Sequence, residues 1–185
     1  MNSPASLRNL THVYASHITA FEVVLMERFC RLRSLPWITL MFKIASRLGD
    51  GPLWICTGIF LLAFNDGHFR LVALAATLAI VLSVLLFMGV KNLIGRPRPF
   101  ESWHVLTCLM APPDKFSFPS GHTMTAFAVW GALFVGTPVL SSFYLVIAFL
   151  IGLSRVFLGL HYPTDVLVGA ALGGGIGIGI ATCII

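Results

Sequence analysis

Charged residues are scarce in this 185-residue chain, and acidic residues are the scarcest of them. Only 10% of the residues are charged, with 7 Asp and Glu against 12 Lys and Arg, whereas 57% are hydrophobic. A soluble domain of this length needs a far more polar surface. The composition therefore excludes a soluble protein and indicates an integral membrane protein, formed by one domain over residues 1–185.

Cysteine and clustered carboxylates are also lacking. The four cysteines show no CxxC spacing, so they support neither a metal site nor a disulfide framework. No acidic cluster is present to hold Mg²⁺, and the sequence predicts neither a metal nor a cofactor. The net charge of +5 is spread between apolar runs, which argues against nucleic acid and favours anionic lipid headgroups as the partner.

Long apolar segments fill most of the chain after residue 48. Residues 71–90 carry no charge and are long enough to cross a bilayer core of ~30 Å as a helix. Glycines recur every four residues at Gly169, Gly173 and Gly177, a spacing that lets helices approach closely. We predict an all-α, polytopic transmembrane bundle of about five spanning helices: 52–64, 71–90, 120–136, 138–160 and 163–185.

The N-terminal region, residues 1–48, is expected to lie at the membrane interface. The segment from His17 to Arg33 mixes apolar and charged residues in the pattern of an amphipathic surface helix, with a short soluble cap as the alternative. Pro36 to Leu48 reads as a short helix, and the following Gly-Asp-Gly-Pro sequence breaks the chain. We expect Asp50, in this break, to cap the next helix rather than to line a site.

Three polar clusters stand at the ends of apolar segments: residues 91–99, 119–122 and 154–165. The first opens the only long polar loop, residues 91–119, and loops of this length are often functional. Counting the crossings places all three clusters on the same side of the membrane. In the same loop, Arg96 and His104 are expected to be solvated.

The clusters together contain groups suited to phosphoryl transfer. Pro163 suits the first turn of a helix, from which Asp165 can reach back to His161 and fix its tautomer. His122 has no acidic residue nearby in sequence and suits general acid catalysis. The chemistry indicated is metal-independent transfer through a phosphohistidine, with a buried polar pair that joins two helices as the alternative for His161 and Asp165.

The three clusters resemble a known signature. The motifs Lys91-x6-Arg98-Pro99, Pro119-Ser120-Gly121-His122 and Ser154-Arg155-x5-His161-x3-Asp165 are similar to those of the type 2 phosphatidic acid phosphatase (PAP2) superfamily. The resemblance implies that His161 is the nucleophile, Asp165 its orienting partner, and His122 the acid that protonates the leaving oxygen. It also implies a phosphate cradle of Lys91, Arg98, Ser120, Gly121 and Arg155.

These motifs recognise phosphate and do not select one lipid. We expect a phosphatase that acts on phosphatidate, phosphatidylglycerol phosphate, undecaprenyl pyrophosphate or lipid A, and the short chain resembles members of bacterial inner membranes. A lipid phosphotransferase and a non-catalytic lipid binder or transporter are the alternatives.

Every Lys and Arg except Arg70 falls on the predicted side of the site, which favours a cytoplasmic site. The family favours the opposite side in bacterial members, and the sequence makes no prediction of oligomeric state.

Overall fold

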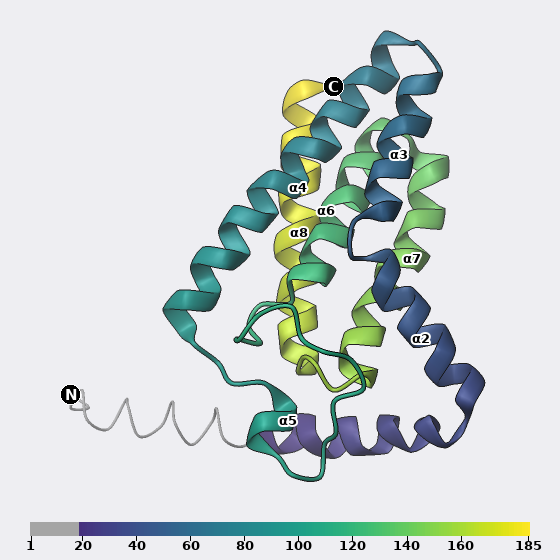
Figure 1. Cartoon of the computed structure of the whole chain (residues 1–185). Coiled ribbons are helices and arrows are strands. Elements are labelled where there is room, and N and C mark those ends of the chain that lie inside the picture. Colours follow the sequence, from purple (N-terminus) through teal and green to yellow (C-terminus); the bar gives the residue numbers. More distant parts are fainter. Residues whose placement is uncertain (1–18) are drawn as a thin grey trace, which may run out of the picture.

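The computed structural model describes residues 19–185, which form helices and connecting segments without a β-strand (Figure 1). The start of the predicted surface helix at His17 lies outside the described residues. Residues 19–30 are helical. The elements that follow are η1 (Arg31–Ser34), α2 (Pro36–Leu48), α3 (Pro52–Ala63), α4 (Gly67–Ile94), α5 (Pro99–Ser102), α6 (Gly121–Gly136), α7 (Pro138–Phe157) and α8 (Pro163–Ile184).

Helix α6 is the centre of the bundle. It packs against α4, α7 and α8, and nearly all of its residues are buried, because its sequence is apolar or small on every side. Its closest neighbour is α8, where a Cβ atom at Gly173 or Gly177 would overlap the carbonyl oxygens of Met124 or Ala128. The close helix approach predicted from the glycine spacing is therefore confirmed.

Among residues 19–185, three segments are long and apolar enough to cross a membrane: Gly67–Ser102, Pro138–Phe157 and Pro163–Ile184. Of the other expected spans, α3 has 12 residues and α6 has 16. Helices α2 and α3 follow one another through the break at residues 49–51 and together rise along the bundle beside α7 (Figure 1). An all-α integral membrane bundle is thus confirmed.

The predicted loop over residues 91–119 begins later than expected. Helix α4 continues to Ile94, so Lys91 lies in its last turn rather than in a loop. The first residue suited to end this helix is Gly95, which adopts the left-handed conformation with φ of 64°. The connection to α6 therefore starts at Gly95, and the short helix α5 interrupts it.

The helix of residues 19–30 crosses the end of the bundle at which α5 lies (Figure 1). Val23 and Met26 are buried against this end of the protein. Phe21, Val24 and Leu25 point outward, and their exposed fractions are between 46% and 71%. The helix therefore has one side that packs on the bundle and a second, apolar side that is uncovered.

Candidate active site

The three motifs meet at one end of the bundle. They occupy the end of α4, the start of α6 and the connection between α7 and α8, which lie at the same end in Figure 1. This is the arrangement predicted by counting the crossings. Five ionisable side chains of the motifs are at most 5% exposed: Lys91, Arg98, Arg155, His161 and Asp165. So many buried charges in an apolar bundle indicate a functional site.

His161 is held in one tautomer. Its Nδ1 atom lies 2.6 Å from the carbonyl oxygen of Ser117, a group that only accepts hydrogen bonds. Nδ1 therefore carries the proton, and Nε2 on the opposite edge of the ring keeps a free lone pair. Asp165, the orienting partner expected from the sequence, lies farther away, with Oδ2 at 3.6 Å from Nδ1. The backbone carbonyl of Ser117 could not have been identified from a motif.

The surroundings of His161 also keep its ring neutral. Burial lowers the pKa of His161 well below its usual value of 6.5, because a buried charge is poorly solvated. The positive charges of Arg155, Arg98 and Lys91 lower this pKa further. A neutral imidazole with a free Nε2 is the form that can act as a nucleophile.

Arg155 offers unsatisfied hydrogen-bond donors. Its side chain is buried, and Nη1 donates to the hydroxyl of Ser46. Within the described part of the chain, Nε and Nη2 have no hydrogen-bond partner. Buried donors without partners are costly, and the planar guanidinium matches two oxygens of a phosphate group. Arg155 is therefore arranged to receive an anion.

The other two cations are paired with Asp114, which sequence reasoning missed. Its carboxylate lies 2.6 Å from Nζ of Lys91 and 2.8 Å from Nη2 of Arg98. Burial raises the pKa of Asp114, but the hydrogen bonds and charges of Lys91 and Arg98 outweigh it, so the net shift is downward. The carboxylate thus occupies donors that the cradle would offer to a phosphate group. Only its place in the loop, five residues before the second motif, could have suggested it.

The first turn of α6 supplies backbone groups to the same region. Ser120 is at the N-cap position, but its hydroxyl pairs with the Thr123 hydroxyl at 2.9 Å rather than with the backbone. The first N–H groups of a helix lack intrahelical partners and favour an anion. At Gly121 an added Cβ atom would lie 3.0 Å from the Phe87 ring, so the close packing explains why glycine is needed.

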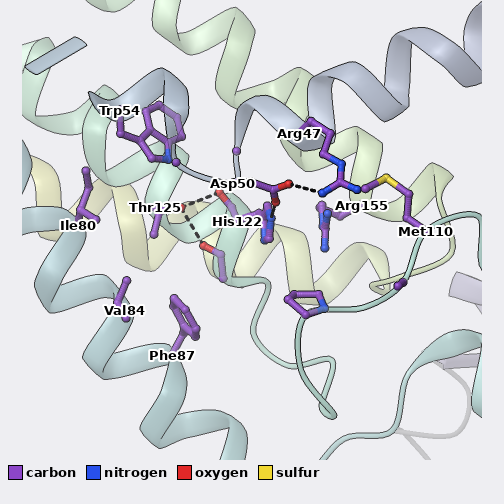
Figure 2. Close-up of a pocket in the computed structure, with 15 residues that line it drawn as sticks. Arg47, Asp50, Trp54, Ile80, Val84, Phe87, Met110, His122, Thr125 and Arg155 are labelled. Atoms are coloured by element: carbon purple, nitrogen blue, oxygen red, sulfur yellow. Dashed lines mark hydrogen bonds and ion pairs between the residues drawn. The ribbon is translucent and has the colours of Figure 1, made fainter. Parts of the chain in front are cut away.

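Asp50 is a partner of His122 and not a helix cap. The N-cap of α3 is Gly51, and no side chain caps this helix. Instead, Oδ1 of Asp50 lies 2.6 Å from Nε2 of His122 (Figure 2). The chain can come this close because of Gly49, where a Cβ atom would lie 3.0 Å from Cδ2 of His122. Burial raises the pKa of Asp50, but the contacts with His122 and Arg47 lower it more. The expectation of a cap failed because the partner is 72 residues away.

Arg96 is likewise an ion-pair partner rather than a solvated loop residue. Its guanidinium contacts Asp165 at 2.6 Å and Glu22 at 2.8 Å. The prediction of solvation is wrong because both partners lie far away in the sequence. His104 is exposed, as expected.

A cavity of about 640 Å³ reaches His122 and Arg155 (Figure 2). Asp50, His122 and Arg155 line its polar part. Its remaining wall is largely apolar and comes from α3, α4 and α6, with Trp54, Ile80, Val84, Phe87 and Thr125. A ligand with a charged head and an apolar tail fits this division.

The described residues contain no obvious metal centre. Between residues 19 and 185, no group of three or more His, Cys, Asp or Glu side chains is arranged to hold a metal ion. The four cysteines are free thiols. The groups available to bind an anion are therefore the cations and the helix N-terminus described above.

The chain belongs to the PAP2 superfamily. The family pattern matches residues 71–184, which include all three motifs and helices α4 to α8. The resemblance seen in the motifs is thereby confirmed.

Relatives and solved structures agree with this family. The chain is 30% identical over 152 residues to lipid A 1-phosphatase from Rhizobium etli, covering 71% of this chain and 65% of the relative. It is 29% identical over 129 residues to undecaprenyl-diphosphatase from Sulfolobus acidocaldarius, covering 69% of this chain and 62% of the relative. The chain thus spans less than two thirds of either relative.

A solved structure is similar over nearly the whole chain. It is the transmembrane PAP2 type phosphatidylglycerolphosphate phosphatase from Bacillus subtilis, with a TM-score of 0.74 and 28% identity. The similarity covers 99% of this chain and 96% of that protein. The similarity therefore includes the N-terminal helices that precede the family match.

Proposed function

We propose that this protein is a membrane-embedded phosphatase that hydrolyses a lipid phosphate or an isoprenyl pyrophosphate through a phosphohistidine at His161. The observation that carries the proposal is the state of His161, which is buried, neutral and hydrogen-bonded through Nδ1 to the Ser117 carbonyl. Plain binding of an anion needs no such nucleophile. A buried arginine with unsatisfied donors, Arg155, supports a phosphate-binding position nearby.

In the first step, the Nε2 lone pair of His161 attacks phosphorus and the bond from phosphorus to the leaving oxygen breaks. Lys91, Arg98 and Arg155 hold the negatively charged phosphoryl oxygens. His122 gives its proton to the leaving oxygen, and Asp50 stabilises the protonated imidazole beforehand.

In the second step, a water molecule attacks the phosphoryl group, and the P–N bond electrons return to Nε2 of His161. His122 takes the proton of this water, which restores its protonated form. Between the two steps the phosphorylated ring carries a positive charge, and the Asp165 carboxylate, 3.6 Å from Nδ1, stabilises it. Inorganic phosphate then leaves the cradle.

The cavity supports a lipid as the substrate. Its apolar wall at Trp54, Ile80, Val84 and Phe87 suits an acyl or prenyl chain, while the phosphate lies at His122 and Arg155. The relatives are named for lipid A, undecaprenyl diphosphate and phosphatidylglycerolphosphate, and all three fit this description. Two of these relatives come from the bacteria Rhizobium and Bacillus, which supports our proposal that the protein resides in a bacterial inner membrane.

The test is a panel of lipid phosphates offered to the purified protein in detergent with EDTA. We expect release of inorganic phosphate from at least one lipid, and no release by the His161→Asn variant. Lipids that bind without releasing phosphate would instead identify a headgroup binder. Transfer of labelled phosphate to an added acceptor lipid, in place of release, would identify a phosphotransferase.

A further inference from the structure

Glu22 is a buried carboxylate that the reaction above does not use. It lies on the helix of residues 19–30 and is 3% exposed, although its neighbour Phe21 is 71% exposed. Burying a carboxylate is costly unless it is paired and hydrogen-bonded. The partners of Glu22 therefore indicate what it does.

One of these partners is the first turn of α8. Oε1 of Glu22 accepts hydrogen bonds from the backbone N–H and from the hydroxyl of Thr164, both at 2.7 Å. The first N–H groups of a helix favour an anion, because they lack partners and lie at the positive end of the helix dipole. Glu22 thus caps α8 within the same turn as Asp165, although 142 residues separate it from Thr164.

The second partner is Arg96, which joins Glu22 to Asp165. Nη2 of Arg96 lies 2.8 Å from Glu22, and Nη1 lies 2.6 Å from Oδ1 of Asp165. The guanidinium also lies over the Tyr162 ring, 3.9 Å from its centre. A planar group with carboxylates at its edge and a ring on its face is held in one orientation.

Asp165 is consequently fixed at both oxygens. Oδ1 accepts from Arg96, and Oδ2 accepts from the backbone N–H of Tyr162 at 2.8 Å. This arrangement points Oδ2 toward Nδ1 of His161 at 3.6 Å. The contacts form a continuous series from Glu22 through Arg96 and Asp165 to His161.

We propose that Glu22 and Arg96 are positioning residues, which hold Asp165 where it stabilises the phosphorylated His161 ring. The inference rests on the proposed function. It makes the helix of residues 19–30, which carries Glu22, part of the active site. Its physical basis is that the ring gains a positive charge when Nε2 bonds to phosphorus. A carboxylate that moved away at that moment would stabilise this charge less.

A purely structural role for Glu22 predicts different kinetics. If it only tied the surface helix to α8, its loss would lower the melting temperature and leave kcat of the folded protein unchanged. A positioning role predicts a lower kcat with KM unchanged, because the phosphate is bound by other side chains.

The first experiment compares Glu22→Gln with Glu27→Gln in the full-length protein, on a lipid phosphate that the wild type hydrolyses. Glu27 lies on the same helix and is partly exposed, so it is the matched control. We expect kcat of Glu22→Gln to fall on the order of tenfold, by analogy with carboxylates that orient metal-bound histidines. Wild-type kcat in the folded Glu22→Gln protein would overturn the proposal.

The second experiment adds Arg96→Gln to form a double-mutant cycle. If Glu22 acts through Arg96, removing Glu22 from the Arg96→Gln protein should cost no further kcat. If the factors by which the two single substitutions lower kcat multiply in the double variant, Glu22 and Arg96 act independently. That result would overturn the proposal that Glu22 acts through Arg96. Should Glu22→Gln fail to fold, Arg96→Lys replaces it, because lysine keeps the charge and cannot bridge two carboxylates. Wild-type kcat in Arg96→Lys would then overturn the proposal.

A third readout does not depend on turnover. The ring nitrogens of His161 can be assigned in a nitrogen NMR spectrum by comparison with His161→Asn. We expect Glu22→Gln, and not Glu27→Gln, to change their chemical shifts, and unchanged shifts would overturn the proposal. If the wild type hydrolysed no lipid phosphate while these shifts still changed, the proposed function would fall, and the series of contacts from Glu22 to His161 would stand without its catalytic role.

Discussion

The Nε2 atom of His122 lies 2.6 Å from the carboxylate oxygen Oδ1 of Asp50, across 72 residues of sequence. The carboxylate comes from the break between α2 and α3, where irregular backbone lines the cavity. Burial and the positive charge of Arg155 disfavour the protonated imidazole that a general acid needs, and the Asp50 carboxylate opposes both effects. Each of the two histidines of the site therefore has its own acidic residue within 4 Å.

Asp50→Asn should impair the protonation of the leaving group. We expect kcat to fall on the order of tenfold for an alkyl lipid phosphate, as for other residues that orient a catalytic histidine. The loss should be smaller for an aryl phosphate or a pyrophosphate, whose leaving group needs less help from an acid. The measurement is kcat for both substrate classes, and equal losses would contradict the role of the pair.

Arg155→Lys should weaken binding of vanadate. In-line attack passes through a five-coordinate phosphorus, and a site built for that geometry should bind orthovanadate more tightly than phosphate. Lysine keeps the charge but cannot grip two oxygens. Inhibition constants for both anions, measured on both proteins, test this. Equal inhibition of the wild type by vanadate and phosphate would contradict it.

Asp114→Asn should increase the stabilisation of the folded protein by added inorganic phosphate. Removing the carboxylate leaves the buried Lys91 and Arg98 without a negative partner and destabilises the folded protein, although exposure of the Asp114 side chain reduces the loss. A bound phosphate supplies the missing charge, so it should raise the melting temperature more in the variant than in the wild type. Thermal unfolding in detergent with and without phosphate gives both shifts. An equal phosphate effect in the two proteins would show that Asp114 does not occupy the phosphate position.

The lowered pKa of His161 should make the fold sensitive to acid. Burial is the largest cause of this shift, followed by the charges of the three cations. In the unfolded chain His161 has a pKa of about 6.5. Below that pH the unfolded chain binds a proton at His161, whereas the folded protein does not. The stability contribution is thus fully present above that pH and is lost as the pH falls toward the folded pKa. His161→Asn should lose less stability on acidification, as measured by thermal unfolding across a pH series, and an identical slope would contradict the shift.

Much of the fold could be predicted from the sequence because long apolar segments mark the helices that can cross a bilayer. The apolar segments and the breaks at glycine and proline indicate the helices, and the glycine spacing in α8 indicates close packing against another helix. That this helix is α6 is known only from the structure. The co-location of the three motifs followed from the number of crossings. The end of α4 was misplaced because a charged residue, Lys91, was taken as the start of the loop, whereas Gly95 ends the helix.

The partners of the motif residues could not be predicted in the same way. Asp50 and Glu22 lie outside the motifs, and Arg96 occupies an unspecified position of the first motif. Each is paired with residues more than 60 positions away. The local sequence alone therefore predicts that Asp50 caps a helix and that the Arg96 side chain is solvated. The hydrogen bond between His161 and the Ser117 carbonyl could not be predicted for another reason. Every residue has a backbone carbonyl, so the residue type at position 117 gives no signal.

The most direct test of the account is to look for phosphate bound to His161 itself. The protein is mixed with a lipid substrate labelled in its terminal phosphate, quenched in alkali within one turnover, and mapped by mass spectrometry. The account predicts a P–N bond at His161 that forms before phosphate is released. The label should accumulate in His122→Ala, which lacks the base for hydrolysis, provided the leaving group is good enough to depart unaided. Product formation in a single turnover with no label on His161 in either protein would contradict the central claim.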